Sequence, residues 1–331
     1  MRIGIIGIGA MGCLLGAHFS DLADVTMFGH WPEQVRTIRE SGLQVLHPNG
    51  NRTRHSIKIT DDPNHLGLID VALVVVKSRQ TADAAIAVAA MLKPDGLAIT
   101  LQNGLNNCAT LRHRLGEHRV TLAVTSEGAT VIGVAEIRHA GHGPTYFGRD
   151  RALAQSQLVW LNAVVKLFGQ AGFEAYVVDD TDSLVWGKLA VNAAINPLTA
   201  LLRVPNGFLI EHPSLITIMA KAAREVAAVA EAQGIQLPFP DAAERAISVA
   251  QATATNRSSM LQDIDRGALT EVEAICGAVA RIAHDLGIST PLNVRLCRLV
   301  RLMEGGEPPL LEQGDVEGLL NLLDYESIAQ A

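Results

Sequence analysis

A narrow stripe of polar side chains runs along one otherwise apolar helical segment, Trp186–Leu202. Lys188, Asn192 and Asn196 recur there at intervals of four residues, which places them within roughly 80° of one helix face. Their neighbours are Leu, Ala, Val and Ile, whereas a solvated face usually mixes Glu, Lys and Gln. The stripe therefore favours the lining of a wet pocket over a plain exposed face. In such a pocket a lysine can protonate a carbonyl oxygen as a general acid, and asparagines can hold a carboxylate or a hydroxyl.

A second group of polar residues, Ser259, Asp263 and Glu271, follows further along the chain. Ser259 and Asp263 share one helix face because four residues separate them. Glu271 lies in the expected first turn of the next helix, where a carboxylate interacts favourably with the helix dipole. The same carboxylate could instead bind a substrate, and the sequence leaves both interpretations of Glu271 open.

A glycine-rich turn near the N-terminus has the residue types that accept a dinucleotide. It follows a short apolar strand, opens a helix, and consists of Gly7, Ile8, Gly9, Ala10, Met11 and Gly12. The first glycine permits a tight turn, the second lets the backbone approach a pyrophosphate, and the third lets helix and strand pack closely. The N-terminus of the helix offers N–H groups to the phosphates. Further βαβ units follow the turn, so the fingerprint predicts a dinucleotide site.

The residue that separates NAD from NADP is missing from its expected place after the second strand. An acidic residue there favours NAD and an arginine favours NADP, but this chain has Gly29, His30 and Trp31. His30 could bond a 2′-phosphate, and Lys77 and Arg36 are further candidates, although Lys77 could also be a solvated lysine at a strand end. Because no carboxylate repels a phosphate, the sequence somewhat favours NADPH and leaves NADH open.

Asn103 follows a predicted strand, within the sequence Leu-Gln-Asn-Gly. Open α/β sheets bind ligands at the carboxyl ends of their strands, which makes Asn103 a candidate site residue. An Asn-Gly pair is also a common turn, and this alternative stays open.

The secondary-structure pattern of the sequence changes near residue 179. Up to residue 179, strands alternate with helices, which predicts a parallel sheet in an α/β N-terminal Rossmann-type dinucleotide-binding domain, residues 1–179. The expected strands are Arg2–Ile6, Asp24–Phe28, Asp70–Val76, Leu97–Leu101 and Ala175–Val178, with β-hairpins in 120–150. Helical patterns alone follow, which predicts an all-α C-terminal domain for substrate and catalysis, residues 180–331. These patterns cover Ser183–Leu202, Ser214–Gln233, Asp241–Thr255, Glu271–Leu286, Pro291–Met303 and Asp315–Leu323.

The bulk composition excludes several classes of protein. The 331 residues, 48% of them hydrophobic, suit two globular domains, and the net charge of -7 with scattered Lys and Arg argues against a nucleic-acid partner. The four cysteines are scattered and form no Cys-x-x-Cys pair. This pattern is typical of the reduced thiols of a cytosolic protein. We expect no signal peptide and no membrane span. The expected location of the protein is therefore the cytoplasm. The long apolar helices leave two alternatives open, packing within one chain or between two chains of a homodimer.

Other kinds of chemistry have little support in the sequence. His139 and His142 lie in a glycine-rich stretch, whereas metal-binding histidine pairs usually lie on a helix with a carboxylate partner, so we expect no metal. No Gly-x-Ser-x-Gly elbow is present, which leaves hydrolase chemistry without a visible nucleophile.

In order along the chain, these residues resemble the ketopantoate reductase (2-dehydropantoate 2-reductase) family. The resemblance covers almost the whole chain and is more specific than any one motif. It is carried by GIGAMG, VVVKSRQ with Lys77, LQNG with Asn103, WGKLAVNAAINPLTAL with Lys188, Asn192 and Asn196, PNG with Asn206, SSMLQDI with Ser259 and Asp263, TEVEAI with Glu271, and GISTPLN.

The resemblance implies an NADPH-dependent reduction of ketopantoate, a small 2-oxo acid, to pantoate in the route to pantothenate and coenzyme A. It implies that Lys188 is the general acid, that Asn103 lies between nicotinamide and substrate, and that Glu271 holds the substrate hydroxyl. The other implied pocket residues are Asn192, Asn196, Asn206 and Ser259. Family members that use NADPH often have an arginine near the position of His30, and this chain departs from that pattern.

Two alternatives to this function remain. One is an NAD(P)-dependent D-2-hydroxy acid dehydrogenase or 2-oxo acid reductase of the same family with another substrate. The other is a dinucleotide sensor without catalysis, which would be expected to lack Lys188 or Glu271, although both are present.

Overall fold

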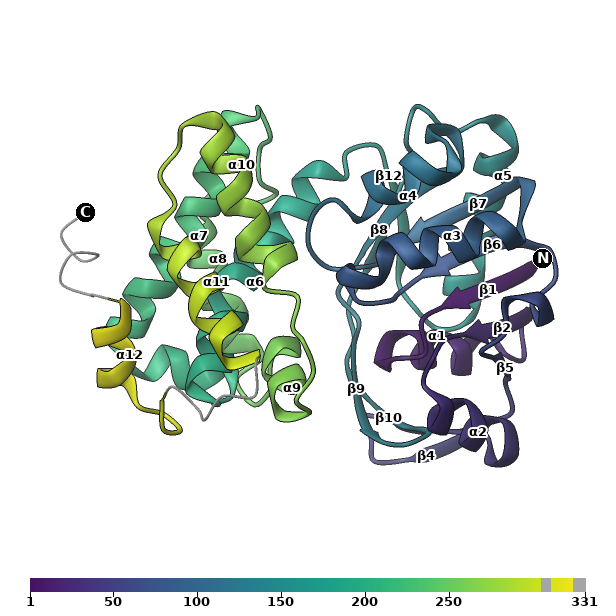
Figure 1. Cartoon of the computed structure of the whole chain (residues 1–331), viewed down its shortest axis with the longest axis horizontal. Coiled ribbons are helices and arrows are strands. Elements are labelled where there is room, and N and C mark those ends of the chain that lie inside the picture. The colour runs from purple at the N-terminus through teal and green to yellow at the C-terminus, as the bar shows by residue number, and fades with distance from the viewer. Residues whose placement is uncertain (305–310, 324–331) are drawn as a thin grey trace. The chain divides into compact units, whose positions relative to one another are not determined.

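The computed structural model describes residues 1–304 and 311–323 (Figure 1). They form two compact units. The first unit contains Met1–Gln102 and Asn106–Thr181, and the second contains Asn103–Leu105 and the described residues from Asp182 onward. The α/β class of the N-terminal part and the all-helical class of the C-terminal part are confirmed.

An eight-stranded sheet is the centre of the first unit. Its strands are β1 (Arg2–Ile6), β2 (Asp24–Phe28), β5 (Lys58–Thr60), β6 (Ile69–Val74), β7 (Leu92–Thr100), β8 (Val120–Thr125), β11 (Thr145–Gly148) and β12 (Ala175–Val178). Their order in space is β12-β11-β8-β7-β6-β1-β2-β5, and every pair is parallel except β8 with β11. The run from β5 to β8 has the strand order of dinucleotide-binding folds.

Helices pack against this sheet on both faces. They are α1 (Ala10–Phe19), α2 (Pro32–Ser41), α3 (Thr81–Met91), α4 (Asn107–Leu115) and α5 (Gln155–Gln170), with short 3-10 turns at Pro63–His65, Ser78–Gln80 and Glu117–Arg119. All six residues of β6 are buried. Val71 and Leu73 belong to one apolar cluster, and Ala72 and Val74 belong to another. This arrangement explains why the strand is an unbroken apolar run in the sequence.

A second sheet of four strands was not predicted as a unit. It consists of β3 (Leu43–Leu46), β4 (Arg52–His55), β9 (Gly128–Gly133) and β10 (Glu136–Gly141), in the order β4-β3-β10-β9. The hairpin of β9 and β10 lies within the stretch where hairpins were expected. β3 and β4 were missed because these short strands lack a strong apolar pattern and β3 finds its parallel partner, β10, far along the chain.

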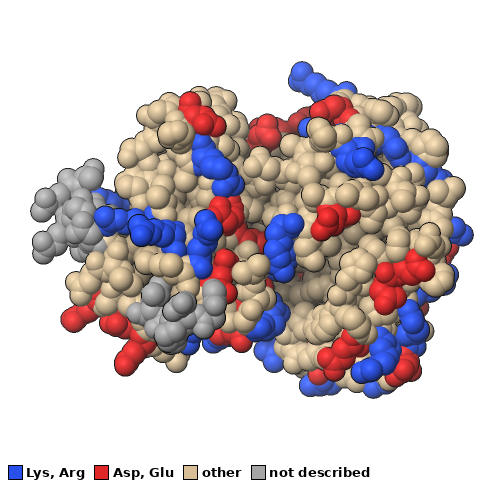
Figure 2. Space-filling model, viewed as in Figure 1, with Lys and Arg blue, Asp and Glu red and all other residues tan. Residues whose placement is uncertain are grey.

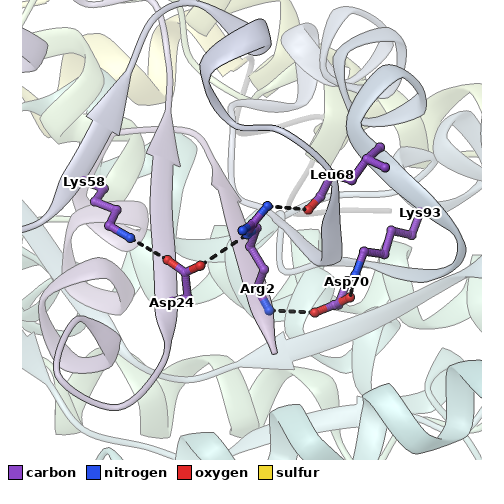
Figure 3. A network of polar contacts seen from close by, with 6 residues as sticks. All are labelled: Arg2, Asp24, Lys58, Leu68, Asp70 and Lys93. Atoms are coloured by element: carbon purple, nitrogen blue, oxygen red, sulfur yellow. Dashed lines mark hydrogen bonds and ion pairs between the residues drawn. The ribbon is translucent and has the colours of Figure 1, made fainter.

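A network of ion pairs joins the amino ends of the parallel strands (Figure 3). The backbone N–H of Arg2 donates to Asp70 at 2.7 Å, and Lys93 Nζ lies 2.6 Å from the same carboxylate. Asp24 accepts from Arg2 Nε at 3.2 Å and from Lys58 Nζ at 2.7 Å. Ligands of such sheets bind at the opposite, carboxyl edge, so this network serves the structure of the sheet.

The second unit is built around one long helix, α6 (Asp182–Leu202), whose residues from Ala193 to Leu202 are all buried. α6 contacts helices α7, α8, α9 and α11. The other elements are the 3-10 turn η4 (Asn206–Glu211), α7 (Pro213–Ala232), α8 (Ala242–Ala252), α9 (Ser259–Asp265), a π-helical turn (Glu273–Gly277), α10 (Ala278–Leu286), α11 (Pro291–Glu304) and α12 (Val316–Leu323). Alanine and aliphatic side chains dominate this core.

The surface carries charges of both signs. On the face drawn in Figure 2, Lys and Arg side chains are interspersed with Asp and Glu. Within the described part of the chain, no helix has the length and apolar character needed to cross a membrane.

Candidate active site

The three glycines of the N-terminal turn have three different surroundings in the structure. Gly7 has a φ of +120°, and a Cβ there would lie 2.9 Å from the carbonyl carbon of Val75. A Cβ on Gly12 would lie 1.9 Å from the carbonyl oxygen of Gly7, whereas a Cβ on Gly9 would meet no atom within 4 Å. Gly7 and Gly12 are therefore needed for the fold, and Gly9 leaves open space beside the backbone.

The helix that begins at this turn suits an anion. Gly9 is the N-cap of α1, and no side chain caps the helix. The first N–H groups of a helix lack partners within it, and they carry the positive end of the helix dipole. The open side of Gly9 and the uncapped N-terminus of α1 together fit the pyrophosphate of a dinucleotide.

Two buried side chains support the turn, and neither was predicted from the sequence. Gln34 on α2 donates from Nε2 to the carbonyl oxygen of Ile8 at 3.3 Å and accepts from the backbone N–H of Ala135 at 2.7 Å. The thiol of Cys13 also donates to the Ile8 carbonyl, at 3.3 Å. Burial raises the pKa of Cys13 to about 12, so its S–H is retained as a donor. A glutamine inside an amphipathic helix gives no sequence signal for this role.

The carboxyl ends of β6 and β7 are joined by a polar network. Gln102 donates from Nε2 to the carbonyl oxygen of Val76 at 2.9 Å and to the Thr81 hydroxyl at 2.8 Å. That hydroxyl lies 2.8 Å from Oδ1 of the buried Asn107. The network holds the backbone just before Lys77, which is half-buried at the end of this edge of the sheet.

Two residues that could bind the adenosine ribose or its 2′-phosphate lie near the end of β2. His30 is exposed, two residues beyond the strand, and its ring centroid lies 5.0 Å from that of Phe28. Arg36 is exposed on α2. Neither arrangement selects between NAD and NADP.

In the second unit, Lys188 lies partly buried on α6. Burial lowers the pKa of its ammonium from 10.5 to about 8, and the negative charge of Glu271 opposes this shift. The helix packs closely at this point, since a Cβ on Gly187 would lie 2.7 Å from Cδ of Pro238. A lysine with this pKa is protonated at neutral pH and can release its proton readily.

Glu271 is buried and precedes a π-helical turn, Glu273–Gly277. The expected helix from Glu271 therefore begins differently, with a wider turn and with Glu271 outside it. π-helical turns are frequent at functional sites. The carbonyl oxygen of Glu271 accepts from the N–H of Ile275 at 3.1 Å, so Glu271 lies at the N-terminal end of the helical stretch, and its side chain is buried near a lysine. Both interpretations of Glu271, the helix-dipole partner and the substrate ligand, therefore stay open.

The segment Asn103–Leu105 packs beside this turn as part of the second unit. Asn103 Nδ2 lies 3.4 Å from Glu271 Oε2, and the N–H of Leu105 donates to the carbonyl oxygen of Ala274 at 3.1 Å. Gly104 has a φ of +82°, and a Cβ there would lie 2.5 Å from that same oxygen. The Asn-Gly pair thus forms a turn, as its alternative interpretation held, and the turn also brings Asn103 to Glu271.

The remaining predicted pocket residues differ in burial. Asn192 is partly buried and Asn196 is buried on α6. Asn206 is buried in η4, where its Nδ2 donates to the Thr253 hydroxyl at 2.8 Å. The Oδ1 atom of Asn206 is buried without a hydrogen-bond partner. Buried polar atoms without partners are uncommon, so this oxygen is suited to a donor from a ligand.

The two serines at the start of α9 have different environments. Ser258 is buried as the N-cap, and its hydroxyl lies 2.7 Å from that of Thr199 on α6. Ser259, the residue predicted for the pocket, is exposed, and Asp263 on the same helix is buried and pairs with Arg266 at 2.8 Å. Ser259 and Asp263, which the spacing predicted to share one helix face, therefore differ in solvent exposure.

The sheet order, the glycine turn and the partly buried lysine define a class of protein, the two-unit NAD(P)-dependent oxidoreductases. Comparison with known proteins narrows this class. Residues 3–151 match the family "Ketopantoate reductase PanE/ApbA", and residues 180–304 match "Ketopantoate reductase PanE/ApbA C terminal". The chain belongs to the ketopantoate reductase family.

Individual relatives agree with this assignment. The chain is 37% identical to the 2-dehydropantoate 2-reductase of Halobacterium salinarum over 92% of this chain and 99% of that protein. A PanE/ApbA family ketopantoate reductase from Ralstonia eutropha JMP134 superposes with a TM-score of 0.83 at 30% identity, over 92% of this chain and 99% of the other. D-mandelate dehydrogenase with NADH and anilino(oxo)acetate superposes with a TM-score of 0.85 over 92% and 99%. At 24% identity, this last likeness shows the fold alone.

Proposed function

We propose that this chain reduces 2-dehydropantoate (ketopantoate) to pantoate with NADPH, and that Lys188 is the general acid. The similarity to enzymes named 2-dehydropantoate 2-reductase supports the substrate. The observation that carries the mechanism is the partly buried Lys188, whose pKa is lowered to about 8 in the presence of the Glu271 charge. No observation on the described residues favours the D-2-hydroxy acid dehydrogenase alternative.

The cofactor is held by residues of the glycine turn. The backbone at Gly7, Ile8, Gly9, Ala10, Met11 and Gly12 binds the pyrophosphate, and His30 and Lys77 face the adenosine ribose. When bound, the reduced nicotinamide supplies a hydride to the carbonyl carbon of the substrate. Neither His30 nor Lys77 carries a carboxylate that would repel a 2′-phosphate. This favours NADPH as the hydride donor and leaves NADH as a second donor.

Lys188 supplies the proton that the reduction requires. At pH 7 its ammonium form predominates, because the pKa is about 8. The Nζ atom donates a proton to the substrate oxygen as that oxygen gains negative charge, and the ammonium stabilises the charge before transfer is complete. Lys188 is left as a neutral amine, which regains a proton from water before the next turnover.

The substrate is held by groups that can bond a carboxylate and a hydroxyl. Glu271 accepts a hydrogen bond from the terminal hydroxyl of ketopantoate, and Asn103 positions that carboxylate. Asn206 offers its buried Oδ1 as an acceptor, and Asn192 and Asn196 bind through neutral amides. Ser259 contributes a hydroxyl at the exposed side.

Several broader expectations accompany this proposal. Residues 1–179 bind the cofactor and residues 180–331 bind the substrate, except that Asn103 joins the second group. The 2-oxo acid is the small-molecule partner. A homodimer and a cytoplasmic location stay predictions from the sequence.

Steady-state kinetics with several 2-oxo acids test the proposal. We expect kcat/KM for ketopantoate to exceed the values for phenylpyruvate and for branched 2-oxo acids that lack a hydroxyl. A higher kcat/KM for phenylpyruvate would instead identify a reductase of bulkier, apolar substrates and would remove the proposed role of Glu271.

A further inference from the structure

A cluster of metal-ligating side chains lies in the first unit, in a different unit from Lys188. It consists of Glu127, His139 and His142, and one nitrogen of each histidine and one carboxylate oxygen lie within 4.8 Å of one another. His139 Nε2 is 2.6 Å and His142 Nδ1 is 3.6 Å from the same oxygen, Oε2 of Glu127. The two imidazole rings lie 4.1 Å apart between centroids.

The fold places these three residues together by pairing two strands. His139 lies on β10 and pairs with Ala129 of β9, and His142 follows the end of β10. Glu127 lies just before β9, where its Oε1 accepts from the backbone N–H of Gly143 at 3.3 Å. From the sequence we expected no metal, because metal-binding histidine pairs usually lie on a helix with a carboxylate partner. Glu127 is that partner, and it lies 12 residues before His139.

Burial makes this cluster unusual. The side chains of His139 and Glu127 are 1% and 3% exposed, and the ion pairs of Glu127 within the described residues involve only His139 and His142. A buried carboxylate requires a compensating charge or several hydrogen bonds. The Nδ1 atom of His139 is buried and has no hydrogen-bond partner. The other ring nitrogen, Nε2, faces Glu127 and is the atom that would bind an ion.

We propose that Glu127, His139 and His142 bind a divalent transition-metal ion of the zinc class. Two imidazole nitrogens and one carboxylate oxygen are a common donor set for Zn²⁺, and a water molecule would complete four ligands. His142 is 60% exposed, so it gives the ion access from solvent. The ion joins the start of β9 to the end of β10 and supports this hairpin.

The two distances from Glu127 Oε2 to the histidine nitrogens can be compared with those that tetrahedral zinc requires. Bond lengths of about 2.0–2.2 Å place neighbouring ligand atoms about 3.3 Å apart. The separation of 3.6 Å between His142 and Glu127 already suits this geometry. The separation of 2.6 Å between His139 Nε2 and Glu127 Oε2 must widen by roughly 0.7 Å when the ion binds between them.

The test uses the full chain without a histidine tag, after treatment with a chelator. Calorimetric titration with Zn²⁺ should show one ion per chain, and Co²⁺ should give the intense visible absorption of a four-coordinate ion. His142→Ala should lower the Zn²⁺ affinity by at least about tenfold and abolish the rise in Tm that Zn²⁺ gives the unmodified chain. His113→Ala is the matched control, because His113 is an exposed histidine on α4, and it should leave both measurements unchanged.

Absence of stoichiometric Zn²⁺ binding, or equal binding by the His142→Ala and His113→Ala variants, would overturn the proposal. Glu127→Gln provides a second variant, which keeps a hydrogen-bond acceptor for His139 and removes the charge. If it does not fold, the exposed His142 still decides the question. His142→Ala should retain reductase activity, because His142 is not among the residues proposed to bind the cofactor or the substrate.

Discussion

Replacing Lys188 by methionine should make the protein more stable at neutral pH while it removes activity. Methionine keeps the length of the side chain and removes the charge that burial disfavours. A pKa lowered from 10.5 to about 8 corresponds to a cost of about 3 kcal/mol to the native state, at about 1.4 kcal/mol per pH unit. This figure is an upper limit because Lys188 is partly exposed and its lost contacts offset part of the gain.

The pH dependence isolates the charge from those lost contacts. Below pH 8, Lys188 is protonated in both the native and the unfolded state, so the native state bears the full cost. Between pH 8 and 10.5 the unfolded chain binds more protons than the native state, and the stability of the unmodified protein rises relative to that of the variant. Above pH 10.5 the cost is gone. The advantage of Lys188→Met should therefore shrink by up to about 3 kcal/mol across this range.

Urea denaturation of both proteins at pH 7 and near pH 10.5 measures this difference. Lys166→Met is a matched control, because Lys166 is exposed on α5 and its charge remains in water. A stability difference between Lys188→Met and the unmodified protein that stays the same at both pH values would refute the argument that Lys188 carries a buried charge.

The proposed role of Lys188 as the general acid also predicts how kcat depends on pH. The acid form is the active one, so kcat for reduction should fall as pH rises through about 8, and oxidation of pantoate should improve over the same range. Lys188→Met should lower kcat by about a hundredfold or more with little change in cofactor binding, and Lys188→Arg should rescue it poorly, since guanidinium hardly releases its proton. A near-normal kcat with an unaltered pH profile would remove Lys188 from the mechanism.

The remaining predictions concern binding. Gly9→Asp should abolish dinucleotide binding, measured by fluorescence titration, without loss of the fold, because its Cβ meets no atom within 4 Å, whereas Gly12→Ala should destabilise the fold itself. His30→Arg should raise the ratio of kcat/KM for NADPH over NADH, since a guanidinium pairs bidentately with a phosphate, and an unchanged ratio would place His30 away from the ribose. Glu271→Ala should raise KM for ketopantoate more than for trimethylpyruvate, which lacks the hydroxyl, by about 1.5–3 kcal/mol in binding. Equal effects on the two substrates would assign Glu271 a structural role.

Local patterns were enough to predict most of the fold. The strands Arg2–Ile6, Asp24–Phe28 and Ala175–Val178 lie where the sequence placed them. The first two are largely buried parallel strands, which their own apolar residues identify. Ala175–Val178 lies at the edge of the sheet and is only partly buried. Strand β6 ends at Val74, two residues before the end of the apolar run. Patterns of 3.6 residues also predicted six helical segments of the second unit to within a few residues, except that the segment expected from Glu271 begins with a π-helical turn. The short helix α9 was not among the predicted ranges.

Features that depend on distant partners could not be predicted in this way. The pairing of β3 with β10 joins Val45 to Ile137, and no local pattern encodes such a register. The link from Gln34 to Ile8 and the approach of Asn103 to Glu271 are likewise products of tertiary packing. The stripe on α6 was visible in the sequence because the residues lie on one helix, but the low pKa of Lys188 follows from the residues packed around it.

The most direct test of the central claim is the stoichiometry of the proposed reaction. Purified protein is mixed with NADPH and ketopantoate at neutral pH, the loss of NADPH absorbance is followed, and the product is identified by mass spectrometry. We expect one pantoate for each NADPH oxidised, with both signals lost in the Lys188→Met variant. Failure of the unmodified protein to form pantoate with either NADPH or NADH would contradict the proposed function.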